Sequence, residues 1–373
     1  MDSDVLVAGA GFAGAVAARR LAEGYGLRCV VADRRPHAGG LCLDVPDAYG
    51  VPVPRFGPHW FHSSSERVIS FLSRFTAWRE VAFRFLAFAE GRHWPFPVNL
   101  ATYEQLAGRP STPAEMEAAL ETWRESCAEP RSSEEYVLSR AGRRLYELFY
   151  RGYSRKQWGR DPASLDASAC GRIPIRTTRD DRYFDDPFQA VPTGGYAPLF
   201  DRLLDHPGIR VVLGADAREL RATVPHRRLV WTGPLDDLLD RRLGSLPWRA
   251  LRWEAEARGG DGFALPAAQV NYTDETLPFT RRFEPAQVHG HAGGGTTVTT
   301  EWACAPGPGV ETCYPVPAAD ARALRDRYLE AAASDSRVTL VGRFAQYEHL
   351  DMERVVERAL DAADRIGPRL AAP

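Results

Sequence analysis

The segment DVLVAGAGFAGAVAARRLAEGYGLRCVVAD, residues 4–33, sets the fold class of the chain. Its first part, DVLVAGA, is an apolar run typical of a buried strand, and GAVAARRLAEG has helical periodicity. The last part, LRCVVAD, is a second strand pattern, so the segment predicts one βαβ unit. Gly9, Gly11 and Gly14 form a G-x-G-x-x-G motif at the turn between the first strand and the helix.

This motif predicts a dinucleotide site, because it follows a strand, opens a helix and has an acidic residue at the expected distance. Asp33 ends the second strand, 19 residues beyond Gly14. The glycines let backbone N–H groups approach a pyrophosphate, and Asp33 can accept a hydrogen bond from a ribose hydroxyl. Gly39 and Gly40 follow soon afterwards, which is similar to the flavoprotein form of the motif. We therefore expect FAD rather than NAD.

A second cofactor contact is expected near the carboxyl terminus. The segment VTLVGRFAQYEHLDMERVVERAL contains a strand, then Gly342 and Arg343, then a helix that begins after Asp351. That helix end could face the pyrophosphate or the ribityl chain of FAD. Asp351 can also be a plain helix N-cap, and the two roles are compatible.

Composition excludes several classes of protein. The chain has 373 residues, a net charge of −2, 44% hydrophobic and 26% charged residues, which is ordinary for a globular protein and lacks the basic excess of a nucleic-acid binder. We expect no membrane partner and a cytoplasmic location, because the start lacks a signal-peptide pattern and no apolar run is long enough to cross a bilayer. The six cysteines form no C-x-x-C pair, and His59 and His62 lack nearby ligand partners, so no metal site is expected.

The segment RGYSRKQWGRDP, residues 151–162, places Tyr153 and Trp158 among four cations. Such a set could grip a phosphate and stack a base, or it could be a solvated helix end. Lys156 is the only lysine of the chain, and the preference for arginine is typical of a GC-rich genome. The sequence around the segment has to distinguish these readings.

Nine segments together carry a resemblance to a known family. They are GAGFAGAVAARRLA, FGPHWFH, GYSRKQWGR, RIPIR, VPTGGY, WTGPLDD, NYTDETLPFTR, YPV and GRFAQYEHLDM. In this order and at similar spacing they resemble the UDP-galactopyranose mutases over nearly the whole chain. The resemblance implies an isomerase that needs reduced FAD, whose N5 attacks the anomeric carbon of a nucleotide sugar and so interconverts pyranose and furanose rings.

The resemblance also implies a fold and its domains. The fold class is α/β, a Rossmann-like FAD-binding domain with an inserted helical domain and an antiparallel β-sheet substrate domain. The FAD-binding unit covers residues 1–65 and is completed by about 190–240 and 335–373. Residues 66–165 form a mainly helical substrate domain, 166–190 a mobile loop region, and 240–335 the antiparallel sheet.

The family pattern assigns roles to single residues. Arg172 and Arg281 would clamp the phosphates, with hydroxyl donors from Tyr183 and Tyr314. Tyr153 would stack on the nucleobase with Phe149 behind it, while Asn271 could bind the base edge. Trp158 would line the cleft at the loop hinge, and His59 would lie beside the flavin ring. The role of His62 stays open. Under this reading Arg151, Arg155, Lys156 and Arg160 are mostly solvated charges.

Several positions depart from the family pattern near the substrate. His349 stands where a tyrosine is usual and Pro317 where an asparagine is usual, while Pro58 and Trp60 flank His59, and Pro285 replaces a common histidine. Two substrates remain open for this reason. UDP-galactopyranose with UDP-galactofuranose is the first, and a GDP-linked hexose such as GDP-galactose, or a deoxyhexose, is the alternative.

Two other classes share part of the pattern. An FAD-dependent amine oxidase-like oxidoreductase has the same glycine motifs, but Arg172, Arg281 and the KQWGR segment count against it. A non-catalytic nucleotide-sugar binder is the second alternative. As partners we expect a nucleotide sugar, NAD(P)H or another reductant for the flavin, and a possible homodimer.

Overall fold

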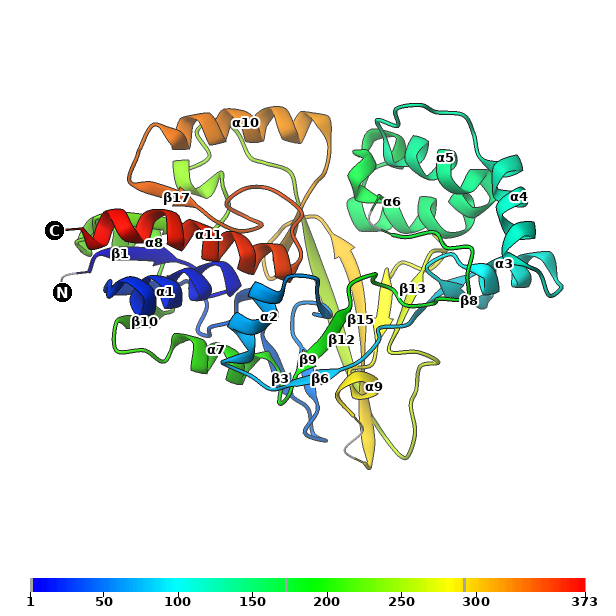
Figure 1. Ribbon diagram of the computed structural model, residues 1–373, viewed down its shortest axis with the longest axis horizontal. Coiled ribbons are helices and arrows are strands. Elements are labelled where there is room, and N and C mark those ends of the chain that lie inside the picture. Colours follow the sequence, from blue (N-terminus) through cyan, green and yellow to red (C-terminus); the bar gives the residue numbers. More distant parts are fainter. Residues whose placement is uncertain (1–2, 172, 291–292, 373) are drawn as a thin grey trace.

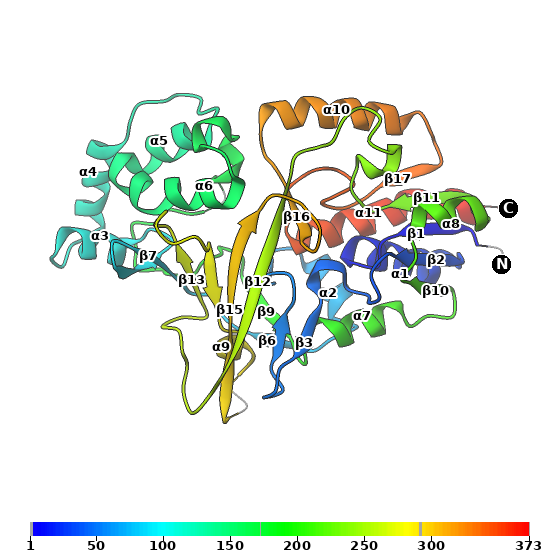
Figure 2. The same cartoon turned by 180° about the vertical axis from the view of Figure 1, so that it is seen from behind.

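A computed structural model describes residues 3–171, 173–290 and 293–372. The chain forms a Rossmann-like part, a long central sheet and a helical part, which follow one another across the molecule (Figure 1). Both termini lie at the Rossmann-like end, while helices α3 to α6 lie at the opposite end (Figures 1 and 2).

The Rossmann-like part contains a five-stranded parallel sheet in the order β10-β2-β1-β11-β17. Its strands are β1 (Val5–Ala8), β2 (Cys29–Asp33), β10 (Ile209–Leu213), β11 (Arg228–Trp231) and β17 (Val338–Leu340). Strands from both ends of the chain thus share one sheet, which confirms the sequence-based expectation. Helix α1 (Phe12–Tyr25) packs side by side with α11 (Met352–Ala371) (Figures 1 and 2). The close packing is possible because the face of α1 is built from small residues such as Ala15 and Ala18, both fully buried.

The central sheet has seven strands in the order β16-β12-β15-β14-β13-β7-β8. They are β7 (Phe85–Ala89), β8 (Arg92–Phe96), β12 (Trp248–Gly259), β13 (Gln269–Tyr272), β14 (Arg281–Phe283), β15 (Gly295–Cys304) and β16 (Glu311–Pro315). All neighbours are antiparallel except β13 and β7. Strands β7 and β8 lie in a stretch whose pattern predicts mainly helix. They are short apolar runs, for which periodicity alone does not separate strand from helix.

The helical part consists of α3 (Leu100–Ala107), α4 (Pro113–Trp123), α5 (Ser133–Leu145), a π-helical turn (Tyr146–Arg151) and α6 (Gly152–Trp158). Capping boxes begin the first three helices, formed by Asn99, Thr112 and Ser132. The π-helical turn places aromatic side chains of residues 146–150 in the core of this part. Helix α6 ends at Gly159, whose positive φ stops the helix at the aromatic segment singled out in the sequence.

The remaining elements connect these parts. They are β3 (Asp44–Pro46), β4 (Pro52–Pro54), β5 (Phe61–Ser63), β6 (Trp78–Glu80), β9 (Phe188–Pro192), α2 (Glu66–Ser73), α7 (Tyr196–Leu204), α8 (Ala217–Thr223), α9 (Ala286–His289) and α10 (Ala319–Ala333). Within the described ranges, no helix is long and apolar enough to cross a membrane. The same ranges contain no cluster of three or more His, Cys, Asp or Glu residues that could hold a metal ion.

Candidate active site

The glycine motif forms a tight backbone cradle at the start of α1. A Cβ atom on Gly14 would lie 1.9 Å from the carbonyl oxygen of Gly9, so any side chain there would push the helix away from the strand. A Cβ on Gly9, whose φ is +113°, would lie 2.2 Å from the hydroxyl of Thr232. Gly9, Gly11, Gly39 and Gly40 line one pocket above this turn. The backbone is thus left open for a ligand to approach closely.

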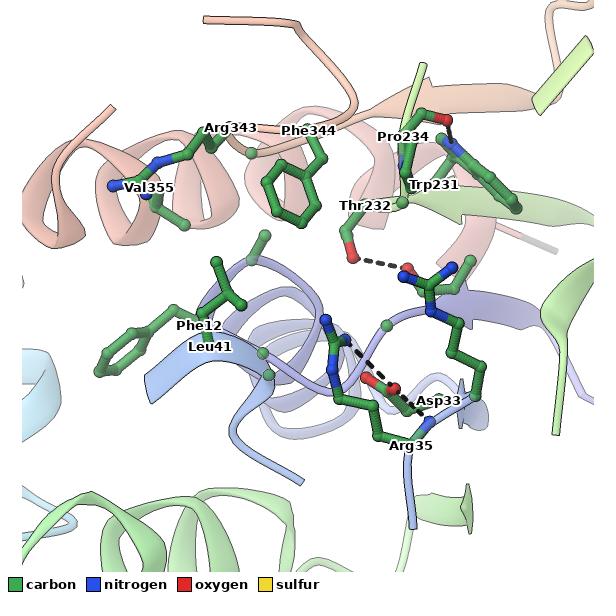
Figure 3. Close-up of a pocket in the computed structure, with 18 of the residues that line it drawn as sticks. Phe12, Asp33, Arg35, Leu41, Trp231, Thr232, Pro234, Arg343, Phe344 and Val355 are labelled. Carbon is green, nitrogen blue, oxygen red and sulfur yellow. Dashed lines mark hydrogen bonds and ion pairs between the residues drawn. The ribbon is translucent and has the colours of Figure 1, made fainter. Parts of the chain in front are cut away.

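Asp33 lies at the end of β2 at the edge of the same pocket (Figure 3). Its carboxylate is buried and accepts hydrogen bonds from the backbone N–H groups of Ala10 and Arg35, both at 2.9 Å. These bonds fix the carboxylate at the pocket wall. Each carboxylate oxygen can accept a further bond, so Asp33 is available to a ribose hydroxyl.

The carboxyl-terminal segment closes the pocket from the other side. Gly342, Arg343 and Asp351 all line it, as the sequence predicts. Arg343 donates to the carbonyl of Leu350 at 2.8 Å and lies over the ring of Tyr314 at 5.3 Å. Asp351 caps α11 by accepting from the N–H of Arg354 at 3.1 Å. Asp351 is therefore an N-cap that also lines the pocket, and its predicted contact with FAD stays a prediction.

His59 lines the same pocket and is close enough to Arg343 and Arg281 to feel their charges. Burial, together with the charges of Arg343 and Arg281, lowers its pKa from 6.5 to about 3. The imidazole is therefore neutral at physiological pH. Its Nδ1 is buried and has no partner among the described residues, while the carbonyl of His59 accepts from the hydroxyl of Tyr196 at 2.9 Å.

A second cavity of about 410 Å³ lies between the helical part and the central sheet. The described residues with predicted substrate roles all line it: Phe149, Tyr153, Trp158, Tyr183, Asn271, Arg281, Tyr314 and His349. They come from the π-helical turn, α6, β13, β14, β16 and two loops, so the fold assembles residues far apart in sequence. The predicted role of Arg172 falls outside the described residues. Asp351 lines both cavities and marks where they meet.

Arg281 is the central charge of this second cavity. Its Nε donates to Glu301 at 2.7 Å and its guanidinium donates to the hydroxyl of Tyr314 at 3.1 Å. Burial alone would lower the pKa of Arg281, but the adjacent carboxylate of Glu301 and the nearby tyrosines raise it well above its ordinary value. The cavity therefore keeps a permanent positive charge. Gly57 permits this arrangement, because a Cβ there would lie 2.8 Å from Glu301.

Aromatic rings cover the walls around this charge. His349 stacks on Tyr314 with ring centroids 5.3 Å apart and planes at 13°, and meets the edge of Trp158 at 5.8 Å. Phe149 is largely buried and packs against Phe96 at 5.6 Å, and both rings line the cavity. Flat rings of this type bind a nucleobase or a sugar face.

A hydrogen-bond relay orients Asn271 at the opposite wall. The indole N–H of Trp60 donates to Gln269 Oε1 at 2.9 Å, and Gln269 Nε2 donates to Asn271 Oδ1 at 2.9 Å. The amide oxygen of Asn271 is thus engaged, and its amide nitrogen is the group that can donate to a ligand. The relay depends on Trp60, one of the positions where the chain departs from the family pattern.

The cations of the segment 151–162 behave in two ways. Arg151, Arg155 and Arg160 form exposed ion pairs with Glu147, Asp161 and Asp320. The expectation of a solvated charge is wrong for Lys156, whose ammonium group donates to four backbone carbonyls. That contact depends on a loop more than a hundred residues away, so the local sequence could not predict it.

Two further residues, one behind the cavity wall and one in it, were not assigned by the sequence. Glu301 is fully buried beside Arg281, and Asp186 holds the ring of His62 through a 2.6 Å contact to Nδ1. His62 also stacks on Phe184 at 3.7 Å and lines the second cavity, which places it on the substrate side. A signal for Glu301 exists: it is the one charged residue in the strand pattern GTTVTTEWAC.

Comparison with known proteins shows the family to which this chain belongs. The family model of UDP-galactopyranose mutase matches residues 148–349, and a model of an NAD(P)-binding Rossmann-like domain matches residues 7–75. The chain is 34% identical over 372 residues to a Klebsiella pneumoniae protein named "Probable UDP-galactopyranose mutase", covering 97% of this chain and 94% of that protein. The chain belongs to the UDP-galactopyranose mutase family. It is therefore an isomerase of the mutase class.

A second relative and two solved structures complete the comparison. The dTDP-fucopyranose mutase of Escherichia coli is 32% identical over 96% of this chain and 97% of its own length. A crystal structure of reduced UDP-galactopyranose mutase matches 99% of both chains with a TM-score of 0.74 at 15% identity. A putrescine oxidase structure matches 99% of both chains with a TM-score of 0.58 at 12% identity. The fold is thus shared with an oxidase, and it is the family match that separates this mutase from it.

Proposed function

We propose that this chain interconverts the pyranose and furanose forms of a nucleoside diphosphate hexose, with UDP-galactopyranose and UDP-galactofuranose as the substrate pair. The observation that carries the proposal is the junction of two sites. A dinucleotide pocket meets a second cavity that holds a buried arginine and several aromatic rings, and Asp351 lines both. A nucleotide sugar in the second cavity would therefore present its sugar to the cofactor.

The dinucleotide pocket fits FAD. A glycine cradle with no room for side chains, the carboxylate of Asp33 and the helix end at Asp351 suit a pyrophosphate and ribose hydroxyls. His59 also lines this pocket. When bound in its reduced form, FAD would supply the electron pair for the anomeric carbon of the sugar. Reduction by NAD(P)H and a homodimer stay predictions.

The protein residues would stabilise the departing nucleoside diphosphate. Charge grows on the phosphates as the glycosidic bond breaks, and Arg281 offers a fixed positive charge with forked donors beside the hydroxyl of Tyr314. Glu301 holds this guanidinium in place at 2.7 Å. His59 is neutral in this arrangement, so it adds no charge of its own. Arg172 is proposed as the second phosphate ligand from the family pattern.

The nucleobase would lie between Tyr153 and Asn271. The amide oxygen of Asn271 already accepts from Gln269, so the amide offers its nitrogen as a donor to the base, while the oxygen keeps one lone pair. This donor can bind the carbonyl edge that uracil, thymine and guanine have, where cytosine and adenine present an amino group. The two relatives above are named for UDP and dTDP substrates, which favours a pyrimidine.

A dTDP-linked deoxyhexose is the second candidate substrate. The relative named dTDP-fucopyranose mutase is about as similar to this chain as the relative named for UDP-galactopyranose. In addition, His349 stacks on Tyr314 at the phosphate end of the cavity, where the family pattern has a tyrosine. A GDP-linked hexose is the third arm of the test.

The test is a substrate panel with the purified protein. UDP-galactopyranose, dTDP-fucopyranose and a GDP-hexose are each incubated with dithionite-reduced enzyme, and pyranose and furanose products are separated by chromatography. We expect ring isomerisation of the UDP sugar at the highest kcat/KM. Conversion of the dTDP or GDP sugar alone would shift the assignment to that substrate, and no isomerisation of any sugar would contradict the proposal.

A further inference from the structure

Lys156 occupies a cage of backbone carbonyls. Its Nζ donates to the carbonyls of Tyr272 at 2.8 Å, Asp274 at 2.7 Å, Leu277 at 2.9 Å and Phe279 at 3.0 Å. These carbonyls come from the last residue of β13 and from the loop that joins β13 to β14. One ammonium group thus binds the loop at both of its ends and in its middle.

The cage requires a lysine. An ammonium group is compact and its three N–H groups point outward from a single atom, whereas the planar guanidinium of arginine is larger and spreads its donors over three nitrogens. Four carbonyl oxygens surround the three N–H groups of Lys156, so one N–H is shared between two of them, and such an arrangement needs all the donors on a single atom. In a chain whose other basic residues are all arginine, the one lysine stands where arginine cannot satisfy the geometry.

The two elements that Lys156 joins both carry the proposed substrate site. On α6, Tyr153 and Trp158 precede and follow it by less than one helical turn. On the other side, Asn271 immediately precedes the caged loop and Arg281 follows it by two residues. The backbones are in direct contact here.

Gly152 allows this contact, because a Cβ on Gly152 would lie 2.2 Å from the carbonyl oxygen of Thr273. The close contact between Gly152 and Thr273 thus sets the distance between the two walls of the cavity, and it lies beside the cage. Arg155 also spans the two elements, through Glu275 at 3.2 Å, but both of its partners are largely exposed and such a pair constrains little.

We propose that Lys156 is a positioning residue for nucleotide binding, which holds the base-stacking wall on α6 at a fixed distance from the Asn271 and Arg281 wall. This role rests on the proposed function, because it takes these residues to bind the nucleotide. It requires no contact between Lys156 and the ligand. A change in the cage should therefore weaken nucleotide binding more than it slows the chemical step.

The test compares Lys156→Arg and Lys156→Met with the control Arg151→Met, an exposed change in the same part of the chain. We expect both Lys156 variants to bind UDP at least tenfold more weakly in a fluorescence titration and to raise KM by a similar factor. Flavin content should be unchanged and kcat should stay within threefold. The control should bind as the wild type does. An arginine variant that binds UDP normally would overturn the role of the cage.

A second measurement uses the wild-type protein, so it applies even if the variants fail to fold. An amine reagent can modify only Lys156 and the amino terminus, because no other lysine is present. Reductive methylation of Lys156, followed by mass spectrometry, should slow at least fivefold when UDP saturates the protein. An unchanged rate would overturn the proposal. Wild-type protein that binds no UDP would instead refute the proposed function, on which this role depends.

Discussion

Replacement of Arg281 by methionine should separate its role in stability from its role in catalysis. The guanidinium is 15% exposed and its partner Glu301 is 0% exposed, so Arg281→Met leaves a buried carboxylate without its counter-ion. Breaking a buried pair from one side costs about 3–5 kcal/mol. In the double variant Arg281→Met with Glu301→Gln the stranded charge is gone. The cost there is two lost hydrogen bonds, about 2 kcal/mol in all.

The single variant should therefore be less stable than the double variant by about 1–3 kcal/mol. Urea unfolding followed by tryptophan fluorescence measures this difference, with equal m-values as the check that only stability has changed. Turnover should fall by at least about a hundredfold in both variants, because both lose the charge that stabilises the departing diphosphate. A single variant that is as stable as the double one, or that turns over within tenfold of the wild type, would refute the role given to Arg281.

Three further substitutions test other parts of the site. Asp33→Ala should lower the ratio of flavin to protein after purification, since it removes the ribose acceptor; unchanged flavin content would exclude that role. Trp60→Phe removes the donor that orients Gln269, so the ratio of UDP affinity to CDP affinity should fall about fivefold in binding titrations. An unchanged affinity ratio would show that the relay does not select the base. The pKa of His59 is lowered from 6.5 to about 3, so the unfolded chain takes up this proton first as the pH falls. The free energy of unfolding should then decrease as the pH falls from 6.5 to about 3, by up to about 1.4 kcal/mol per pH unit from this group. In His59→Asn, the slope of the unfolding free energy against pH should be shallower than in the wild type. Parallel slopes in the two proteins would contradict the burial argument.

Local patterns predicted the Rossmann-like part well. The turn at Gly9–Gly14 and the strands β1, β2 and β17 follow from apolar runs and glycine spacing, which act over a few residues. Strand β12 lies in the range where the resemblance implies an antiparallel sheet, but its own sequence, WRALRWEAEARG, is rich in Ala, Glu and Arg, which are good helix formers. Pairing with β15 along its full length overrides that propensity.

In the site, too, sequence motifs predicted one part, and contacts between distant segments determine the rest. The eight described side chains to which the resemblance assigns substrate roles line one cavity, and six of them lie in the quoted motifs. Their roles stay predictions. The cage around Lys156 and the relay from Trp60 to Asn271 could not be predicted. Both depend on contacts between segments more than one hundred residues apart, and neither leaves a local pattern in the sequence.

The decisive measurement is turnover of UDP-galactofuranose by the same protein preparation in its reduced and oxidised states. Product is separated by chromatography as UDP-galactopyranose. The proposed function predicts conversion by the dithionite-reduced protein and none by the oxidised protein, with the flavin oxidation state unchanged over many turnovers. Equal rates in both states, or net flavin oxidation for each sugar converted, would contradict the proposed function. Net flavin oxidation would instead favour an oxidase function.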